Sequence, residues 1–137
     1  IPSPGLRPSS PLGRGEGLWT EYESNMANYR LDRALDVIWQ YISALDRYID
    51  ETQPWKLAKD DKERLFAVLY ILAESIRHIA WMLLPFMPDT AQKVFDQLGL
   101  GKAELQQPYF DAKQWGGLKQ GVKVSRGNAL FPRLCNV

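Results

Sequence analysis

The sequence predicts an all-α fold, an antiparallel helical bundle followed by an extended, basic C-terminal tail. Two long apolar stripes of helical spacing, with a proline–tryptophan pair between them, support this prediction. Within each stripe the apolar residues recur at alternating steps of four and three, which places them on one face of a helix. The stripes have equal length and a short connection, so we expect the two helices to pack antiparallel around a shared core.

Residues 1 to 18 are expected to form an arm that is disordered or foreign to the native protein. Four of the nine prolines lie there together with several glycines and serines. Such a segment has too little apolar surface to offset the entropy lost on ordering. Trp19 and Tyr22 are the first residues expected to anchor the chain, so the helical bundle should span residues 19 to 100.

The first stripe predicts a helix of about five turns. Its members are Leu31, Leu35, Ile38, Ile42, Leu45 and Ile49. Pro54 has no amide hydrogen and disfavours helical geometry in the residue before it, so the helix should end near Thr52 or Gln53. Trp55 is then held on a rigid corner outside the helix. Trp39 lies beside the stripe and is expected to widen the core or to pack against a third helix.

The second stripe predicts a second helix. Its members are Leu65, Leu69, Leu72, Ile76, Ile79 and Leu83. Asp60 and Glu63 have the spacing of a capping box at its start, and Pro85 and Pro88 should end it. Trp81 lies beside the stripe and has the same expected role as Trp39.

A third, shorter helix should begin at Pro88, because proline suits the first helical position. Gly99 is placed to cap its C-terminus. The residues expected on its buried face are Ala91, Val94, Phe95 and Leu98.

Residues 101 to 137 form the predicted basic tail. They carry six Lys or Arg against two Asp or Glu, a net charge of +4, whereas residues 1 to 100 have a net charge of −3. A basic tail can contact phosphate groups or an acidic partner surface. The apolar run at residues 130–134 is expected to dock on another surface.

The sequence offers no set of residues suited to catalysis. His78 is the only histidine, and inside the second helix it is expected to flank the core and not to bind a ligand. The single cysteine, Cys135, excludes a disulfide framework and fits a reducing cytosol. Asp60 and Asp61 lie at a helix start, where carboxylates stabilise the exposed amides. No glycine-rich phosphate loop follows a strand.

The most apolar run, at residues 65–84, is interrupted by Glu74, Arg77 and His78. These side chains would be costly inside a bilayer, so we expect a buried helix and no membrane span.

Trp55 differs from the other aromatic residues because it follows a helix end and precedes Lys56 and Lys59. An exposed ring of this kind can stack on an unpaired base, which contributes roughly 1–3 kcal/mol, while the ammonium groups contact phosphates. Single-stranded RNA loops are bound in this way. The residues alone leave two alternatives open, a stacking platform for RNA or a packing residue in the core or in a protein interface.

Several runs resemble the anticodon-binding helical domain of bacterial-type methionyl-tRNA synthetases. The resemblance includes Tyr-Arg-Leu-Asp-Arg-Ala-Leu at residues 29–35 and Tyr-Ile-Asp-Glu-Thr-Gln-Pro-Trp at residues 48–55. It continues through Leu-Pro-Phe-Met-Pro-Asp-Thr-Ala at residues 84–91 to Leu-Phe-Pro-Arg-Leu at residues 130–134. Related class I synthetases share the helical bundle but not the pairing of Asp-Glu-x-x-Pro-Trp with Leu-Phe-Pro-Arg.

This resemblance implies that Trp55 stacks on cytosine, the first base of the CAU anticodon of methionine tRNA. Pro54 would shape the corner, and Asp50 would support recognition from the last turn of the first helix. Lys56 and Lys59 are candidate phosphate contacts. Arg133, in the tail, would anchor the chain to the catalytic domain of the parent synthetase.

The resemblance also implies a larger parent protein, a cytoplasmic, ATP-dependent methionine–tRNA ligase. The family's pocket uses an Asn and an Arg on an earlier helix, and we expect no such helix in residues 1 to 19. The catalytic domain, with its His-Ile-Gly-His-like and Lys-Met-Ser-Lys-Ser-like motifs, ATP and Mg²⁺, would lie outside this chain, which looks like a C-terminal fragment.

The expected partners are therefore the methionine tRNA anticodon loop and the parent's catalytic domain, with no membrane and no cofactor in this chain. Catalysis by the chain alone is not expected. The alternative from another class is a helical protein-interaction or structural module without an RNA-binding role.

Overall fold

The structure is a computed structural model that describes residues 16–119, 121 and 123–134. All regular structure in these residues is helical, which confirms the predicted all-α class. Most of the expected N-terminal arm, and Cys135, lie outside the described residues. The elements are α1 (Glu16–Ala27), α2 (Leu31–Thr52), α3 (Pro54–Asp60), α4 (Lys62–Leu83), α5 (Pro88–Gln97), the 3-10 helix η2 (Gly101–Gln106) and α6 (Tyr109–Ala112).

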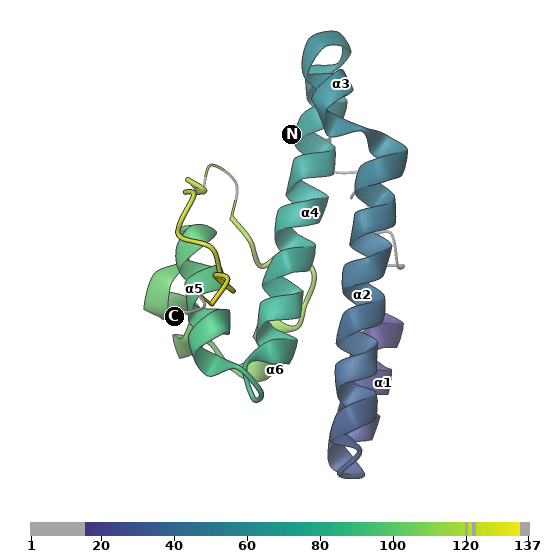
Figure 1. Cartoon of the computed structure of the whole chain (residues 1–137), viewed down its shortest axis with the longest axis vertical. Coiled ribbons are helices and arrows are strands. Elements are labelled where there is room, and N and C mark those ends of the chain that lie inside the picture. Colours follow the sequence, from purple (N-terminus) through teal and green to yellow (C-terminus); the bar gives the residue numbers. More distant parts are fainter. Residues whose placement is uncertain (1–15, 120, 122, 135–137) are drawn as a thin grey trace.

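Helices α2 and α4 form the long antiparallel pair that the two stripes predicted (Figure 1). The short helix α3 connects them at one end of the molecule. Helix α1 packs along α2, and α5 packs against α4 near the opposite end. The result is an elongated hairpin with α3 at its tip.

The buried face of α2 is rotated from the predicted stripe. Ile38 and Leu45 are buried as expected, but Leu31 is exposed. The face that α2 buries comprises Ala34, Val37, Ile38, Tyr41 and Leu45. The rotation occurs because α1 covers this side with Trp19 and Tyr22, which join the same core cluster. Trp39 therefore stays 54% exposed, and its predicted place in the core is wrong.

Helix α4 is rotated in the same manner. Leu69 and Ile76 are exposed, because Glu74, Arg77 and His78 occupy the inward face. Trp81 is buried with its ring centroid 5.7 Å from that of Phe95 on α5, which confirms its predicted packing against the third helix. By length and composition α4 could cross a membrane, but 61% of its most apolar window is buried, as in a core helix.

The helix caps follow the sequence closely, with one shift. The carboxylate of Asp61, and not that of Asp60, accepts a hydrogen bond from the amide of Arg64 at 3.1 Å and caps α4. Asp60 is instead the last residue of α3. Helix α5 begins at Pro88 as predicted. It is followed by Gly99 at φ +78°, where glycine is free of strain.

The helices α1, α3 and α6 and the 3-10 helix η2 were not predicted. Helix α1 begins at Glu16 and contains Trp19 and Tyr22, which are buried anchors as expected. The Tyr22 hydroxyl donates a 2.8 Å hydrogen bond to the carbonyl of Met82. Helix α3 begins at Pro54, so Trp55 lies in the first turn of a short helix and not outside all helices.

The C-terminal segment docks on the bundle only in part. We call residues 101–118 the strap; its Ala112 and Leu118 are buried, and the Tyr70 hydroxyl donates to the Leu118 carbonyl at 2.9 Å. Farther along, Phe131 and Leu134 are 67% and 93% exposed. The apolar run at residues 130–134 thus does not dock on the described bundle, and its docking elsewhere stays a prediction.

Candidate nucleic-acid interface

The corner between α2 and α3 is fixed by backbone geometry. Gln53 adopts a left-handed conformation, with φ 46° and ψ 65°. Its amide donates to the carbonyl of Ile49 at 2.9 Å, and its carbonyl accepts from the amide of Lys56 at 2.9 Å. Pro54 then occupies the first position of α3, where its ring fixes φ. The chain therefore changes direction at Gln53 while both sides of the corner stay hydrogen-bonded.

Trp55 is presented to solvent by this corner. Its side chain is 56% exposed, so it does not fill the core. Lys56 and Lys59 on the same short helix are also exposed. Trp55 and Lys59 are four residues apart, which brings their Cβ atoms to about 5–6 Å. A flat ring and a cation are thus adjacent at the tip of the molecule, the arrangement that suits a stacked base and its phosphate.

Asp50 lies in the last turn of α2 and is exposed. At about 100° per residue, it falls on the side of α2 opposite the buried Tyr41 and Leu45. It is therefore exposed near the corner, where its carboxylate can accept hydrogen bonds from a bound group. The structure thus brings Asp50, Pro54, Trp55, Lys56 and Lys59 to one end of the hairpin.

The other exposed tryptophan, Trp39, lies away from the corner. It lines an open groove of about 530 Å³ along the outer face of α2. The groove residues are Asp36, Trp39, Gln40, Ser43, Ala44 and Arg47. One Asp and one Arg balance each other, so this groove has no net attraction for phosphate.

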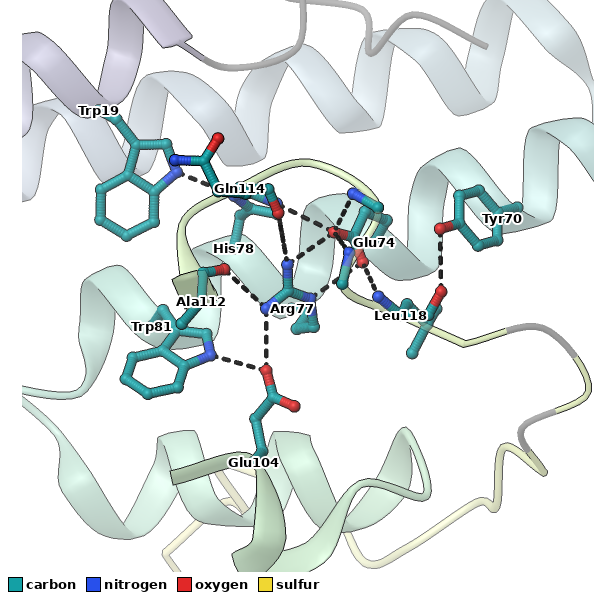
Figure 2. Close-up of polar contacts among 12 residues, drawn as sticks. Trp19, Tyr70, Glu74, Arg77, His78, Trp81, Glu104, Ala112, Gln114 and Leu118 are labelled. Atoms are coloured by element: carbon teal, nitrogen blue, oxygen red, sulfur yellow. Dashed lines mark hydrogen bonds and ion pairs between the residues drawn. The ribbon is translucent and has the colours of Figure 1, made fainter. Parts of the chain in front are cut away.

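A second polar centre lies in the middle of the molecule, and the sequence did not predict it. Glu74, Arg77 and His78 lie at positions i, i+3 and i+4 of α4 and are fully buried (Figure 2). Six donors converge on the Glu74 carboxylate within 3.1 Å. They are Arg77 Nε and Nη2, His78 Nε2, and the amides of Gly116, Gly117 and Leu118.

Arg77 connects α4 to the strap. Its Nη1 donates to Glu104 Oε1 and to the Ala112 carbonyl, both at 2.8 Å, and its Nη2 donates to the Gln114 carbonyl at 3.1 Å. The indole of Trp81 donates to the same Glu104 oxygen at 2.9 Å. The guanidinium is therefore enclosed by acceptors from both segments.

His78 connects α4 to α1. Its Nδ1 accepts a 2.8 Å hydrogen bond from the indole of Trp19, which can only donate. His78 is therefore the neutral tautomer with its proton on Nε2, and that nitrogen donates to Glu74 at 3.1 Å. Trp115 of the strap stacks on the ring at 5.5 Å. His78 thus has a structural role, as predicted, but it is fully buried and does not lie at the edge of the core.

Burial and pairing shift the titration of this buried cluster, which we call the Glu74–Arg77–His78 cluster. Burial raises the pKa of Glu74, but hydrogen bonds from His78 and Arg77, with the charge of Arg77, outweigh it and lower the pKa to about 2. Burial lowers the pKa of His78, and the hydrogen bond to Glu74 opposes this only in part. Every polar group of the cluster has a partner from the protein, so its role is to hold the strap.

One signal could have revealed this cluster. Three ionisable residues at i, i+3 and i+4 in an otherwise apolar helix must share one buried face, and buried charges require partners. No group of three or more His, Cys, Asp or Glu suited to a metal ion occurs in the described part of the chain.

Comparison with known proteins identifies the family. The family described as "Anticodon-binding domain of tRNA ligase" matches residues 12–129. Methionine–tRNA ligase of Fusobacterium nucleatum is 42% identical over 116 residues, which is 83% of this chain and 18% of that protein. The chain belongs to the anticodon-binding domains of methionine–tRNA ligases.

Other relatives agree with this assignment of the domain. The ligase of Bacillus subtilis is 45% identical over 115 residues, 82% of this chain and 17% of that protein. The crystal structure of apo methionyl-tRNA synthetase from Mycobacterium tuberculosis has a TM-score of 0.80 and 27% identity, over 93% of this chain and 26% of that one. The chain thus spans about a fifth of the length of the curated relatives that it matches.

Proposed function

We propose that this domain binds the anticodon loop of methionine tRNA and stacks Trp55 on the first base, cytosine, of the CAU anticodon. The observation that carries the proposal is the exposure of Trp55 on a fixed corner, with Lys59 one helical turn away. A rigid backbone under the ring reduces the conformational entropy lost on binding. Stacking accepts any base, so it supplies affinity and not specificity.

Asp50 contributes to base selection. A carboxylate only accepts hydrogen bonds, and the exocyclic amino group of cytosine only donates. Uracil carries a carbonyl oxygen in the same place, which the carboxylate repels. Lys56 and Lys59 contact the backbone phosphates and balance the negative charge that Asp50 places near the RNA.

The parent protein is, in this proposal, a cytoplasmic methionine–tRNA ligase that attaches methionine to tRNA with ATP. ATP and Mg²⁺ bind, in this proposal, to a catalytic domain outside this chain; the described residues contain no group of three or more His, Cys, Asp or Glu suited to a metal ion. The basic tail, with exposed Arg133 near its end, docks on that domain. Trp55 belongs to α3, which lies at the tip of the hairpin, far from α5 (Figure 1).

A binding series tests the proposal. The 137-residue chain is titrated with an RNA stem-loop bearing CAU and with loops that differ in the first base, at two salt concentrations. We expect the CAU loop to bind most tightly. Trp55→Ala should weaken that binding by roughly 1–3 kcal/mol and leave the free energy of unfolding unchanged. Equal affinity for all loops would contradict specific anticodon recognition.

Trp39 provides a matched control, because it is also a half-exposed tryptophan of this hairpin but lies off the corner. Trp39→Ala should leave the affinity for the CAU loop unchanged.

The rival function, a protein-interaction module, is favoured by the exposed apolar residues Phe66, Leu69 and Ile76 of α4. Phe66→Ser should likewise not alter RNA binding, and a loss equal to that of Trp55→Ala would shift the interface to α4.

A further inference from the structure

Charge is distributed unevenly across the hairpin. Residues 16–52, which include α1 and α2, carry eight Asp or Glu against three Arg, a net charge of −5. Residues 88–134, which include α5, the strap and the segment after it, carry four Asp or Glu against seven Lys or Arg, a net charge of +3. Helix α2 lies on one side of α4, and α5 lies with the segment after the strap on the other (Figure 1). One long side of the hairpin is therefore acidic and the opposite side basic.

The basic side has unpaired cations after the strap. Residues 119–134 contain no Asp or Glu and four cationic residues, Lys119, Lys123, Arg126 and Arg133. All four are exposed, and none forms an ion pair within the part of the chain that the structure describes. Arg133 lies within the exposed apolar run that we expect to dock elsewhere. We call the other three residues, Lys119, Lys123 and Arg126, the cationic strip.

The backbone of the cationic strip is attached to the bundle at two points. Just before the strip, the carbonyl of Leu118 accepts a 2.9 Å hydrogen bond from Tyr70 of α4. Within it, the amide of Ser125 donates to the carbonyl of Gln97 at the end of α5, also at 2.9 Å. A Cβ added at Gly127 would lie 2.9 Å from Nε2 of Gln97, so the chain packs closely there. Because the segment is already attached, its binding to a partner costs less conformational entropy.

The cationic strip lies along the side of the hairpin and not at its tip (Figure 1). Tyr70 is the ninth residue of α4, so the attachment of Leu118 lies about 12 Å along that helix from its tip end. An RNA stem that continues from a loop bound at Trp55 and turns along the hairpin meets either the acidic or the basic side. Its phosphates are repelled by the acidic side and attracted by the basic one.

We propose that the cationic strip contacts backbone phosphates of the stem below the anticodon loop, while the corner holds the loop itself. This inference rests on the proposed anticodon recognition and adds a second RNA contact to it. RNA fits the strip better than an acidic protein surface does, because lysine is depleted at protein interfaces and is common at phosphates. The contact is independent of base sequence, since phosphates carry none.

Salt-dependent titrations test this contact. The 137-residue chain and a variant that combines Lys119→Ala, Lys123→Ala and Arg126→Ala are each titrated at several salt concentrations. The probes are a CAU stem-loop and the same loop sequence as an unpaired oligonucleotide. Each lost phosphate contact should lower the slope of log affinity against log salt by about 0.7–0.9, so the variant should lose about 2 on the stem-loop. On the unpaired oligonucleotide its slope should stay unchanged.

The matched control combines Arg30→Ala, Arg33→Ala and Arg47→Ala. It removes the same charge from exposed residues on the acidic side of the hairpin. Both triple variants should keep the free energy of unfolding, because all six side chains are exposed. Only the variant of the cationic strip should lower the slope. Equal reductions in both would reveal a general effect of net charge and overturn the stem contact.

The outcomes distinguish the two proposals. If Trp55→Ala weakens binding of the CAU loop but the variant of the strip keeps the slope, the stem contact is wrong and the strip is left to a protein surface, while the anticodon proposal stands. If the unaltered chain binds loops with any first base equally and Trp55→Ala has no effect, the anticodon proposal is wrong. A lowered slope in the strip variant would then still support the phosphate contact.

Discussion

The corner at the tip and the Glu74–Arg77–His78 cluster both combine charged and aromatic residues, yet they are opposite in one respect. Every polar group of the cluster is paired within the protein, whereas the corner exposes an aromatic ring and two lysines. Strongly shifted pKa values occur in the cluster, where they reflect a structural role. The binding site that we propose therefore rests on the unpaired groups of the corner and not on shifted pKa values.

The largest expected effect comes from removing the centre of the cluster. Arg77→Ala should destabilise the domain by about 3–5 kcal/mol, because it leaves the buried Glu74 and Glu104 without their shared cation. Urea unfolding followed by far-ultraviolet circular dichroism measures the change. A loss below about 1 kcal/mol would show that the cluster does not hold the fold.

Acid should weaken the cluster in two steps. Glu74 has a folded pKa of about 2 against an ordinary value of 4.5, so its stabilisation is complete above 4.5 and is lost as the pH falls through 2. His78 has a folded pKa below its ordinary 6.5, so its contribution is complete above 6.5 and falls as the pH drops. Each protonation favours the unfolded chain.

Unfolding free energies measured from pH 8 to pH 3 test this order. His78→Gln keeps a donor for Glu74 and an acceptor for Trp19 but does not titrate. It should remove the decline that begins near pH 6.5 and leave the decline below pH 4.5. An unchanged profile in this variant would assign the first step to another group.

Gly117→Ala should have an intermediate effect. A Cβ at this position would lie 2.5 Å from Nη2 of the enclosed Arg77, so the strap or the guanidinium must move. We expect a loss of about 1–3 kcal/mol. Gly17, where an added Cβ meets nothing within 4 Å, is the matched control, and thermal unfolding compares the two.

The smallest effect on stability is expected at the corner. Lys59→Ala should leave the unfolding transition unchanged, because the side chain is exposed. In RNA binding, its loss should reduce the salt dependence by about 0.7 in the slope of log affinity against log salt. If Lys59→Ala instead lowered the free energy of unfolding and left this slope unchanged, Lys59 would have a structural role, like the residues of the cluster, and no contact with phosphate.

The sequence predicted the parts of the fold that depend on local patterns. The period of the apolar residues predicted α2 and α4, and Pro88 with Gly99 predicted both ends of α5. Helix α1 was missed because the glycine-rich residues at its start obscured the helical spacing of Trp19, Tyr22 and Met26. The rotation of α2 and α4 depends on what covers each helix, and a single helix's pattern does not contain that information.

At the candidate site, too, the sequence predicted the local features and missed those that depend on residues elsewhere in the chain. The proline and tryptophan of the corner were visible in the sequence, because their effect on the backbone is local. The conformation of Gln53 was not, since a left-handed glutamine has no distinct sequence signal. The cluster was missed because its partners are 27 to 59 residues apart in the chain.

The three amides that reach Glu74 from Gly116, Gly117 and Leu118 set a lower limit on the size of an autonomous fragment. A truncation at residue 100 would keep all the long helices, yet it would remove these donors together with Glu104, the counter-ion of Arg77. Glu74 and Arg77 would then keep their ion pair with each other but lose every partner that the strap supplies. The cooperative folding unit therefore extends at least to Leu118, and shorter fragments should populate loosely packed states.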